Sequence, residues 1–396
     1  MTRAVGTVVR GVRAPIIRQG DDLANIIVES VLAAKNESGA EFGKKDVVSV
    51  TEAVVARSQG NYASCDDIAA DVKAKFPEGH IGLVFPILSR NRFSMCLKGI
   101  ARGAKKITVM LSYPSDEVGN HLVDMEKLDE ENINPWTDVL SEEEYRKHFG
   151  STMHTFTGVD YVAYYRSLIE AEGAEAEFVF ANKASEILNY TKDVICCDIH
   201  TRQRSKRIIK AKGGNTVLGL DDILTTPGSM GGYNKDYGLL GSNKATEETV
   251  KLFPRDCNEF VTRVQKIFEE KAGYHMEVMI YGDGAFKDPV GKIWELADPV
   301  VSPGYTDGLG GLPNEIKLKY LADNDYANLS GEALREAIVK NIKEKDANLK
   351  GSMASQGTTP RRITDLLGSL SDLTSGSGDK GTPIIWIQNY FDNYAD

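Results

Sequence analysis

The sequence predicts a fold that combines α-helices with β-strands. Short apolar runs of strand length recur along the chain, for example at 46–50, 81–87 and 107–111. Between such runs, apolar residues recur at helical spacing behind residues that favour helix N-termini, such as Asp21 and Ser64. With 396 residues and 41% hydrophobic content, the chain is long enough for two or more domains with sizeable cores.

Each expected element depends on its own pattern. The first strand, at 4–9, alternates weakly between apolar and polar residues. Ser64 with Asp67 three residues later resembles a capping box that begins a helix. Residues 53–56 continue the strand at 46–50 as a second apolar run. The other expected elements are helices at 159–168, at 257–272 and after Ser330, and strands at 177–181, 193–197, 276–281 and 384–387.

Composition and charge exclude several classes of partner. The chain carries 47 Lys and Arg against 57 Asp and Glu, so its net charge is −10. This acidic balance argues against general binding to nucleic acid or to an anionic membrane. No apolar run approaches the roughly 18 residues that a membrane span needs. The five cysteines are odd in number and lack CxxC spacing, so we expect a reduced, cytoplasmic protein without a disulfide framework or zinc site.

The densest group of chemical residues follows the apolar run at 193–197. Asp198 ends this expected strand, and His200, Arg202 and Arg204 follow closely. A carboxylate at a strand end beside concentrated positive charge suits a site that holds a metal ion together with phosphate oxygens. A surface loop with an ordinary ion pair is the alternative interpretation.

Two further segments carry candidate ligands for an anion or a metal. Arg90 and Arg92 precede the strand at 107–111 and could form an anion cradle, or a solvated basic helix. The acidic pair Asp116 and Glu117 lies in the loop after that strand and could face a metal or begin a helix. Asp283 ends a later strand between two glycines, which let the backbone approach a ligand closely but also suit a tight turn.

Common catalytic signatures are absent from the sequence. The Gly-rich loop at 305–314 lacks the GxxxxGK[ST] spacing, and no GxGxxG follows a strand and begins a helix. The sequence therefore gives little support to P-loop or Rossmann folds. It also contains no GxSxG or HExxH motif, so no hydrolase signature is present.

Four segments together resemble a known family. Residues 15–23 read PIIRQGDDL, where the family has Pro, two hydrophobic residues and Lys, followed by Glu-Gly-Asp-Asp-Leu. Residues 55–60 read VARSQG, where the family has a strand ending in VSKAEG. Residues 198–202 read DIHTR, against a central DTNGR, and 282–284 read GDG, against a late GEG. By these motifs the chain resembles the coenzyme F-420 gamma-glutamyl ligase family.

The resemblance implies an α+β fold with mixed or antiparallel sheets and packed helices, and a homodimer. It implies GTP-dependent condensation of L-glutamate onto a carboxylate-bearing acceptor, either a deazaflavin of the F-420 type or a folate-like molecule, with Mg²⁺ or Mn²⁺. By position, the expected nucleotide contacts are Pro15, Ile16, Ile17, Arg18 and Arg57, joined by Arg90 and Arg92; the expected metal ligands are Asp198, Asp283 and Asp116; and the expected catalytic residues are Asp198, His200 and Arg202.

The chemistry of amide formation is consistent with these residue types. A carboxylate must first be activated, usually as an acyl phosphate, because hydroxide is a poor leaving group. Phosphoryl transfer then requires metal ions that bridge phosphate oxygens and cations that spread the developing charge. Carboxylates such as Asp198 suit the first requirement, and arginines such as Arg57 and Arg202 suit the second.

Two departures from the family pattern matter. The family's Gly-Ile-Asp metal motif aligns with residues 99–101, where Ala101 replaces the carboxylate, so Asp116 or Glu117 is the candidate replacement. Ile199 stands where the family has a hydroxyl ligand. A non-catalytic nucleotide- or anion-binding protein on the same fold is therefore the alternative function.

The resemblance also suggests a division of the chain. Residues 1–300 are expected to form the catalytic region, with a polar surface insertion at about 121–155. Residues 301–396 are expected to form a C-terminal extension with a Gly/Ser-rich loop at 374–381, which is either a linker or a mobile lid.

Overall fold

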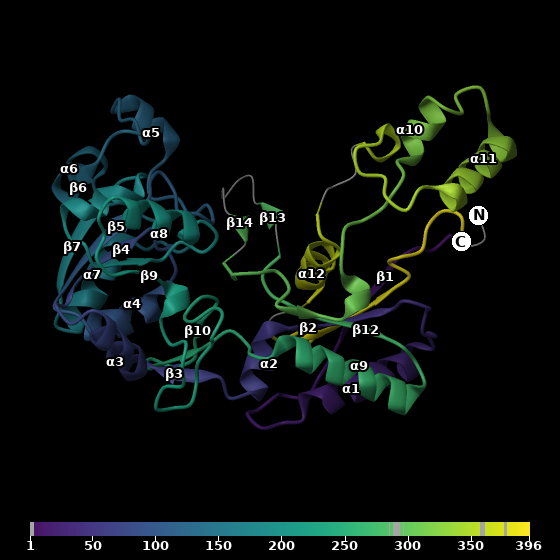
Figure 1. Ribbon diagram of the computed structural model, residues 1–396, viewed down its shortest axis with the longest axis horizontal. Helices are drawn as coiled ribbons and strands as arrows, with labels where there is room; N and C mark the ends of the chain where they lie inside the picture. The colour runs from purple at the N-terminus through teal and green to yellow at the C-terminus, as the bar shows by residue number, and fades with distance from the viewer. Residues whose placement is uncertain (1–3, 285, 288–293, 296, 357–360, 376–377) are drawn as a thin grey trace.

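The computed structural model describes residues 4–284, 286–287, 294–295, 297–356, 361–375 and 378–396. Two sheets with their helices form two lobes that lie beside each other (Figure 1). The middle of the chain builds the first lobe, and the N-terminal and C-terminal parts build the second. Gly376 and Ser377 of the predicted Gly/Ser-rich loop lie outside the described residues.

The first lobe contains the largest sheet. Its strands are parallel except for an edge strand, β6, which pairs antiparallel with β7. In the described part of the chain, six strands form it, in the order β6 (Leu140–Ser141), β7 (Glu175–Phe180), β5 (Lys106–Leu111), β4 (His80–Val84), β8 (Val194–Cys196) and β9 (Val217–Gly219).

Helices cover both faces of this sheet. One face packs on α3 (Cys65–Lys75), α4 (Phe93–Arg102) and α7 (Tyr161–Ala171), with Leu83 and Val109 in the shared core. The other face packs on the 3-10 helix η1 (Ala184–Asn189) and α8 (Arg202–Ala211). Strands buried on both faces read as continuous apolar runs, which is why the sequence marks β4 and β5 clearly.

The parallel strands follow a doubly wound order. From β4 the chain builds outward through β5 to β7 over one face, and then returns to build β8 and β9 over the other. The direction of winding changes between β4 and β8, and ligands of such sheets bind outside the carboxyl ends of the strands at this switch point. The structure thus has a Rossmann-like strand order although the sequence lacks the glycine fingerprint. The absence of this motif was therefore a wrong reason to disfavour a Rossmann-like strand order.

The second lobe is organised around a mixed sheet. Its strands β2 and β12 are parallel to each other, and the other pairings are antiparallel. In the described residues its order is β1 (Val8–Val12), β16 (Ile384–Gln388), β2 (Val47–Thr51), β12 (Glu277–Tyr281) and β15 (Gly304–Tyr305). Helices α1 (Leu23–Ser38) and α9 (Cys257–Ala272) pack on one face, and α12 (Ile363–Thr374) packs on the other.

Shorter elements link and extend the lobes. Strands β3 (Tyr62–Ser64), β11 (Thr249–Lys251) and β10 (Asn243–Lys244) form a small antiparallel sheet near the junction of the lobes (Figure 1). The remaining elements are α2 (Glu52–Ser58), α5 (Met125–Glu130), α6 (Glu142–Phe149), η2 (Leu220–Asp222), β13 (Phe286–Lys287), β14 (Trp294–Glu295), η3 (Asp307–Leu309), α10 (Leu318–Asp323), α11 (Gly331–Glu344) and η4 (Met353–Ser355).

The structure confirms most expected elements and corrects some. The mixed class of helices and sheets is confirmed, as is the capping box, in which Ser64 and Asp67 exchange hydrogen bonds. The first strand lies at Val8–Val12, later than expected. Residues 53–56 were wrongly expected to be extended, because they lie in α2, where Val55 and Ala56 are buried. A short apolar run does not distinguish a buried strand from a short buried helix.

The sheets also bear on the expected division of the chain. Residues 301–396 do not form a lobe of their own, because β16 lies between β1 and β2. The expected insertion at 121–155 is not only a surface excursion, since Leu128, Tyr145 and Phe149 are buried in the first-lobe core. The Tyr145 ring stacks on Phe180 of β7, with ring centroids 3.8 Å apart. This segment has an apolar side that is buried and an acidic side that faces outward. Its high content of acidic residues therefore led to the prediction of a surface segment.

Candidate active site

Loops at the carboxyl edge of the first-lobe sheet carry half of the predicted site residues. Residues 85–92 follow β4, 112–120 follow β5, and 197–201 follow β8. Because these strands are parallel, the loops gather at one edge around the switch point. The sequence-predicted residues on or beside these loops are Arg90, Arg92, Asp116, Asp198, His200 and Arg202.

Asp198 is buried at the end of β8, with only 1% of the residue exposed. Its Oδ2 atom accepts hydrogen bonds from Thr201 Oγ1 at 2.6 Å and from Ser205 Oγ at 2.8 Å. Its Oδ1 atom accepts none from any residue that the structure describes. Burial raises the pKa of Asp198 to about 6, although the two hydroxyl donors oppose this rise. Asp198 thus offers one unsatisfied carboxylate oxygen.

Glu117 reaches the same place from the loop after β5. Its carboxylate accepts backbone N–H groups from Ile199 at 2.6 Å, from His200 at 3.1 Å and from Thr201 at 2.9 Å. These N–H groups lead into α8 and lie at the positive end of its dipole. Thr201 donates to both carboxylates, through its N–H group to Glu117 and through its hydroxyl group to Asp198, so the two carboxylates lie close together. The charge of Glu117 contributes to the raised pKa of Asp198.

Asp116 organises the loop that presents Glu117. Its Oδ2 atom accepts from Leu88 N at 2.8 Å and from Asn120 Nδ2 at 2.7 Å. Its Oδ1 atom accepts from Val118 N at 3.1 Å and from Asn120 N at 2.8 Å. Burial raises the pKa of Asp116 to about 6 in spite of these donors. Four donors occupy both oxygens, so neither is left over for a metal ion in this arrangement.

Arg202 and His200 lie at the start of α8 with different exposures. Arg202 is partly buried, its Nε atom lies 2.9 Å from Asp221 Oδ2, and its guanidinium donates to the Ile199 carbonyl. Asp221 follows β9, so this ion pair stays within the first-lobe edge. The His200 side chain is exposed. The structure therefore holds Arg202 in place and leaves His200 at the surface of the turn.

Arg92 joins the two lobes. Its guanidinium lies 2.6 Å from Asp298 Oδ1 and 2.8 Å from Asp283 Oδ2. Asp283 follows β12 in the second lobe, and its N–H group donates to Asp298 at 2.9 Å. Arg92 also lines a small pocket with Ile199. Sequence analysis missed Asp298, because no strand end or glycine pattern marks it.

A second buried ion pair lies at the carboxyl edge of the second-lobe sheet. Glu52 follows β2 and is 5% exposed. Lys251 Nζ donates to its Oε1 atom at 2.8 Å and to its Oε2 atom at 2.6 Å. Burial raises the pKa of Glu52, Lys251 opposes the rise, and the charge of Asp298 adds to it. Glu52 and Asp283 follow neighbouring parallel strands, so this edge gathers carboxylates as the first-lobe edge does. Sequence analysis missed this pair too.

The two N-terminal motifs of the resemblance lie side by side. The Gly20 N–H group donates to the Ser58 carbonyl at 2.9 Å, and Gly60 packs against the Gln19 side chain. Ile17 is buried, whereas Ile16 is 81% exposed. Of the other residues expected to contact nucleotide, Pro15, Arg18 and Arg57 are exposed here, and Arg90 is exposed at the first-lobe edge.

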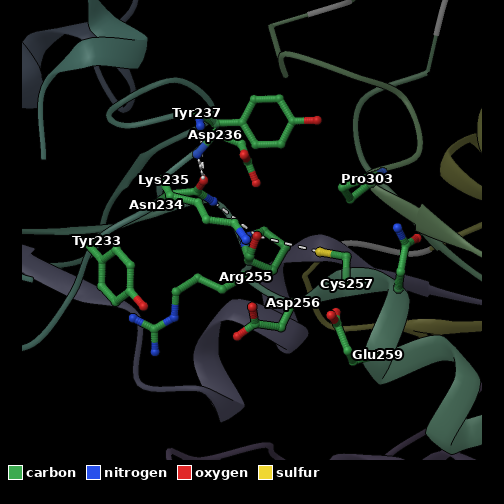
Figure 2. Close-up of a pocket in the computed structure, with 12 residues that line it drawn as sticks. Tyr233, Asn234, Lys235, Asp236, Tyr237, Arg255, Asp256, Cys257, Glu259 and Pro303 are labelled. Atoms are coloured by element: carbon green, nitrogen blue, oxygen red, sulfur yellow. Dashed lines mark hydrogen bonds between the residues drawn. The ribbon is translucent and has the colours of Figure 1, made fainter. Parts of the chain in front are cut away.

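The structure also contains a pocket of about 300 Å³. Its walls come from residues 233–237, 254–259 and Pro303, and Figure 2 shows Arg255 extending toward the Tyr233 ring, whose centroid lies 4.7 Å from the guanidinium carbon. The Gln59 side chain donates to the Arg255 carbonyl at 2.6 Å and accepts its N–H group at 2.9 Å. The pocket therefore adjoins the 55–60 motif.

A model of the F420-0:gamma-glutamyl ligase family matches residues 11–389. The chain belongs to this family. The resemblance stated from the motifs is therefore confirmed, and the family indicates an enzyme with gamma-glutamyl ligase activity in F420 biosynthesis, acting on glutamate and an F420-type substrate. None of the curated proteins compared with the chain matches it.

The family match extends beyond the region in which sequence analysis found motifs. It continues past residue 300 and includes β16, which agrees with the place of β16 inside the second-lobe sheet. In the part of this ligase that the structure describes, no helix is long and apolar enough to span a membrane.

The donor set of this family member fits a divalent cation at Asp198. Among the described residues, no three His, Cys, Asp or Glu side chains form a group that could hold a metal ion. Mg²⁺ in nucleotide enzymes is usually held by one or two carboxylates together with water and substrate phosphates. The unsatisfied Oδ1 atom of Asp198 suits that arrangement. Asp116 and Asp198 lie at one carboxyl edge and Asp283 at the other, and Arg92 connects the edges.

Proposed function

We propose that the protein is a GTP-dependent gamma-glutamyl ligase that uses Mg²⁺ or Mn²⁺ and activates its acceptor as an acyl phosphate. The acceptor is an F420-0-type deazaflavin, with a folate-like carboxylate as the other candidate. The observation that carries the proposal is the unsatisfied oxygen of Asp198 beside the N–H groups that begin α8. This switch-point edge is where doubly wound sheets bind phosphates.

The reaction divides into two steps. An oxygen of the acceptor carboxylate takes the γ-phosphoryl group of GTP, and GDP leaves. The amino group of glutamate then attacks the acyl carbon, phosphate leaves with the bonding electrons, and the nitrogen gives up a proton. Asp198 would hold a divalent cation, which would supply positive charge against the negative charge that develops on the phosphate oxygens.

The nucleotide contacts are proposed from exposure and position. Arg92 is fully engaged with Asp283 and Asp298, so the exposed Arg57 and Arg90 are better placed to meet phosphate oxygens. Gln59 joins the 55–60 motif to the pocket of Figure 2, and Ile16 is exposed in the neighbouring 15–23 motif, so we propose that base and ribose lie in this region. The homodimer implied by the resemblance stays a prediction that a molar-mass measurement would test.

The position of Ala101 in the structure weakens the case for the alternative function, a non-catalytic anion-binding protein. It relied on Ala101 at the position of a family carboxylate. Ala101 is buried in the apolar core at the C-terminal end of α4, whereas the site lies beside the N-terminal end of that helix. At about 1.5 Å of rise per residue, a helix of this length separates its ends by more than 10 Å. A carboxylate at position 101 would therefore not reach the site.

Turnover of defined substrates tests the proposal. Purified protein would be incubated with GTP, Mn²⁺, L-glutamate and either F420-0 or a folate, and inorganic phosphate would be measured. We expect phosphate release only when glutamate and the correct acceptor are both present, with an amide product of matching mass. Binding of GTP without turnover under every combination would overturn the ligase proposal and favour the anion-binding alternative.

A further inference from the structure

The helix α8 is capped by a carboxylate from a distant loop. Its first turn holds no acidic residue, and the side chain of its N-cap, Thr201, makes no capping hydrogen bond. The N–H groups of residues 199–201 are satisfied instead by Glu117, which belongs to the loop after β5. A carboxylate here has the same acceptor geometry that a phosphate group would present to a helix N-terminus.

A second feature at this place points to a ligand. Only 1% of Asp198 is exposed, and its Oδ1 atom has no hydrogen-bond donor among the described residues. Thr201 donates to the carboxylates of both Asp198 and Glu117, so the two carboxylates lie close together. Two carboxylates this close disfavour each other unless a cation or a proton lies between them. Among the described residues, Asp198 Oδ1 therefore has no donor, and the carboxylate of Glu117 occupies the N–H groups of residues 199–201.

The loop that carries Glu117 is held by contacts other than those of Glu117 itself. The turn that carries it is fixed independently by the four hydrogen bonds to Asp116. Glu117 is only partly buried, so its side chain can rotate outward while the turn stays in place. Arg204 and Arg207 lie exposed on α8 and add positive charge to the surroundings of the vacated N–H groups.

We propose that the N–H groups of residues 199–201 form a phosphate-binding site and that Glu117 occupies it as an internal competitor until a phosphate group displaces it. The proposal rests on the proposed nucleotide function of this edge and names how access to it is controlled. The incoming phosphate would replace the carboxylate of Glu117 at the N–H groups of residues 199–201, and Asp198 would hold any cation that accompanies the phosphate.

Binding of tripolyphosphate without metal tests this directly. Isothermal titration in EDTA would compare the wild type with Glu117→Gln and with Glu143→Gln, which removes an exposed charge from α6 in the same lobe. The apparent dissociation constant equals the intrinsic one divided by the fraction of molecules with an open site. If Glu117 fills the site in nine molecules of ten, Glu117→Gln binds about tenfold more tightly. Glu143→Gln should bind like the wild type.

A second variant and a second measurement guard against a folding defect. Glu117→Asp keeps the charge on a shorter side chain, so we expect an intermediate gain in affinity. Hydrogen exchange of the amides at 199–201 should be faster in Glu117→Gln and slow again when tripolyphosphate is added. Unchanged or weaker binding in both variants, with the native circular dichroism spectrum retained, would overturn the proposal and make Glu117 a structural cap or a cation ligand.

The outcomes separate this proposal from the ligase proposal. Tripolyphosphate binding needs neither GTP turnover nor an acceptor. Tighter binding by Glu117→Gln in a protein that never releases phosphate from GTP would keep the phosphate site and reject the ligase. Wild-type turnover with unchanged tripolyphosphate binding in Glu117→Gln would do the reverse.

Discussion

A carboxylate oxygen that is buried without a donor destabilises the fold that holds it, because the desolvation of the charge is not repaid by hydrogen bonds. Asp198 is such a case, and two hydroxyl donors on Oδ2 leave its pKa raised to about 6. Strongly perturbed carboxylates in clefts occur most often at functional sites. The residue is therefore more readily explained by a ligand than by folding.

The first prediction concerns Asp198→Asn. The amide keeps the shape and can still accept from Thr201 and Ser205, but it no longer provides an anionic oxygen for a metal ion. We expect phosphate release from GTP to fall at least about a hundredfold, as for loss of a metal ligand or its supporting group. Asp129→Asn, an exposed residue of α5, is the control. A wild-type rate in Asp198→Asn would remove Asp198 from the metal site.

Residue-scale features were only partly predictable from the sequence. Asp198 and Asp283 could be singled out because each follows an apolar run, and a strand end is a position that sequence patterns mark. Asp298 and Lys251 could not, because each acts through a contact with a segment distant in sequence. Glu117 was named only as a possible replacement for the carboxylate missing at Ala101, and its contact with residues 199–201 was not predicted. Such contacts depend on which strands become neighbours, and that information is not local.

At the scale of elements, the C-terminal strand is the part of the second-lobe sheet whose importance is easiest to overlook. β16 pairs with β1 on one side and with β2 on the other, and the Trp386 side chain is fully buried. Its indole N–H group donates to Asp46 Oδ2 at 2.9 Å. A single residue before β2 thus links the first and last parts of the chain.

The second prediction uses this link to test pH dependence. Burial raises the pKa of Asp46 above its ordinary value of 3.8. A raised folded-state pKa means that the contribution of Asp46 to stability is complete below the unfolded value and is lost as pH rises through the folded one. Asp46→Asn does not titrate. We therefore expect the wild type to lose more unfolding free energy than Asp46→Asn between about pH 4 and pH 7. Parallel curves from urea unfolding would contradict this.

The third prediction concerns truncation. A chain that ends at Lys380 lacks β16, so β1 and β2 lose their shared neighbour and the apolar side chains around Trp386 have no partner. We expect the second lobe to lose cooperative unfolding and to become sensitive to protease. A chain that ends at Gln388 keeps the strand and loses only the packing of Tyr390 and Phe391 on this core, so it should still unfold cooperatively, with a smaller loss of stability. Equal protease resistance of the two truncated chains would show that β16 is dispensable.

Sequence patterns predicted the existence of most elements better than their arrangement. The capping box at Ser64 and the apolar runs of β4 and β5 are local signals, and the structure confirms them. The helix α2 was missed because four apolar residues suit either state. The doubly wound order was missed because the glycine fingerprint, the usual sequence mark of such sheets, is absent from this chain. Strand order depends on tertiary contacts that a single sequence does not state.

At the scale of the whole molecule, the two lobes meet through buried charge. Arg92, at the start of α4, lies between Asp283 and Asp298 of the second lobe, and Asp298 is only 2% exposed. Loss of one partner from a buried ion pair leaves an uncompensated charge and destabilises proteins by about 3–5 kcal/mol. The geometry of the proposed site depends on this contact, because the facing carboxyl edges are held together by Arg92.

The last prediction therefore concerns Arg92→Met, measured without nucleotide by guanidinium unfolding. We expect the free energy of unfolding to fall by about 3 kcal/mol or more, since Asp298 loses its cation. Lys271→Met removes the exposed pair with Glu29 and should cost less than about 1 kcal/mol. In the double variant Arg92→Met with Asp298→Asn, the buried charge is gone as well, so part of the lost stability should return. A cost for Arg92→Met as small as that for Lys271→Met would mean that the lobes separate freely and that Asp298 becomes hydrated when its partner is lost.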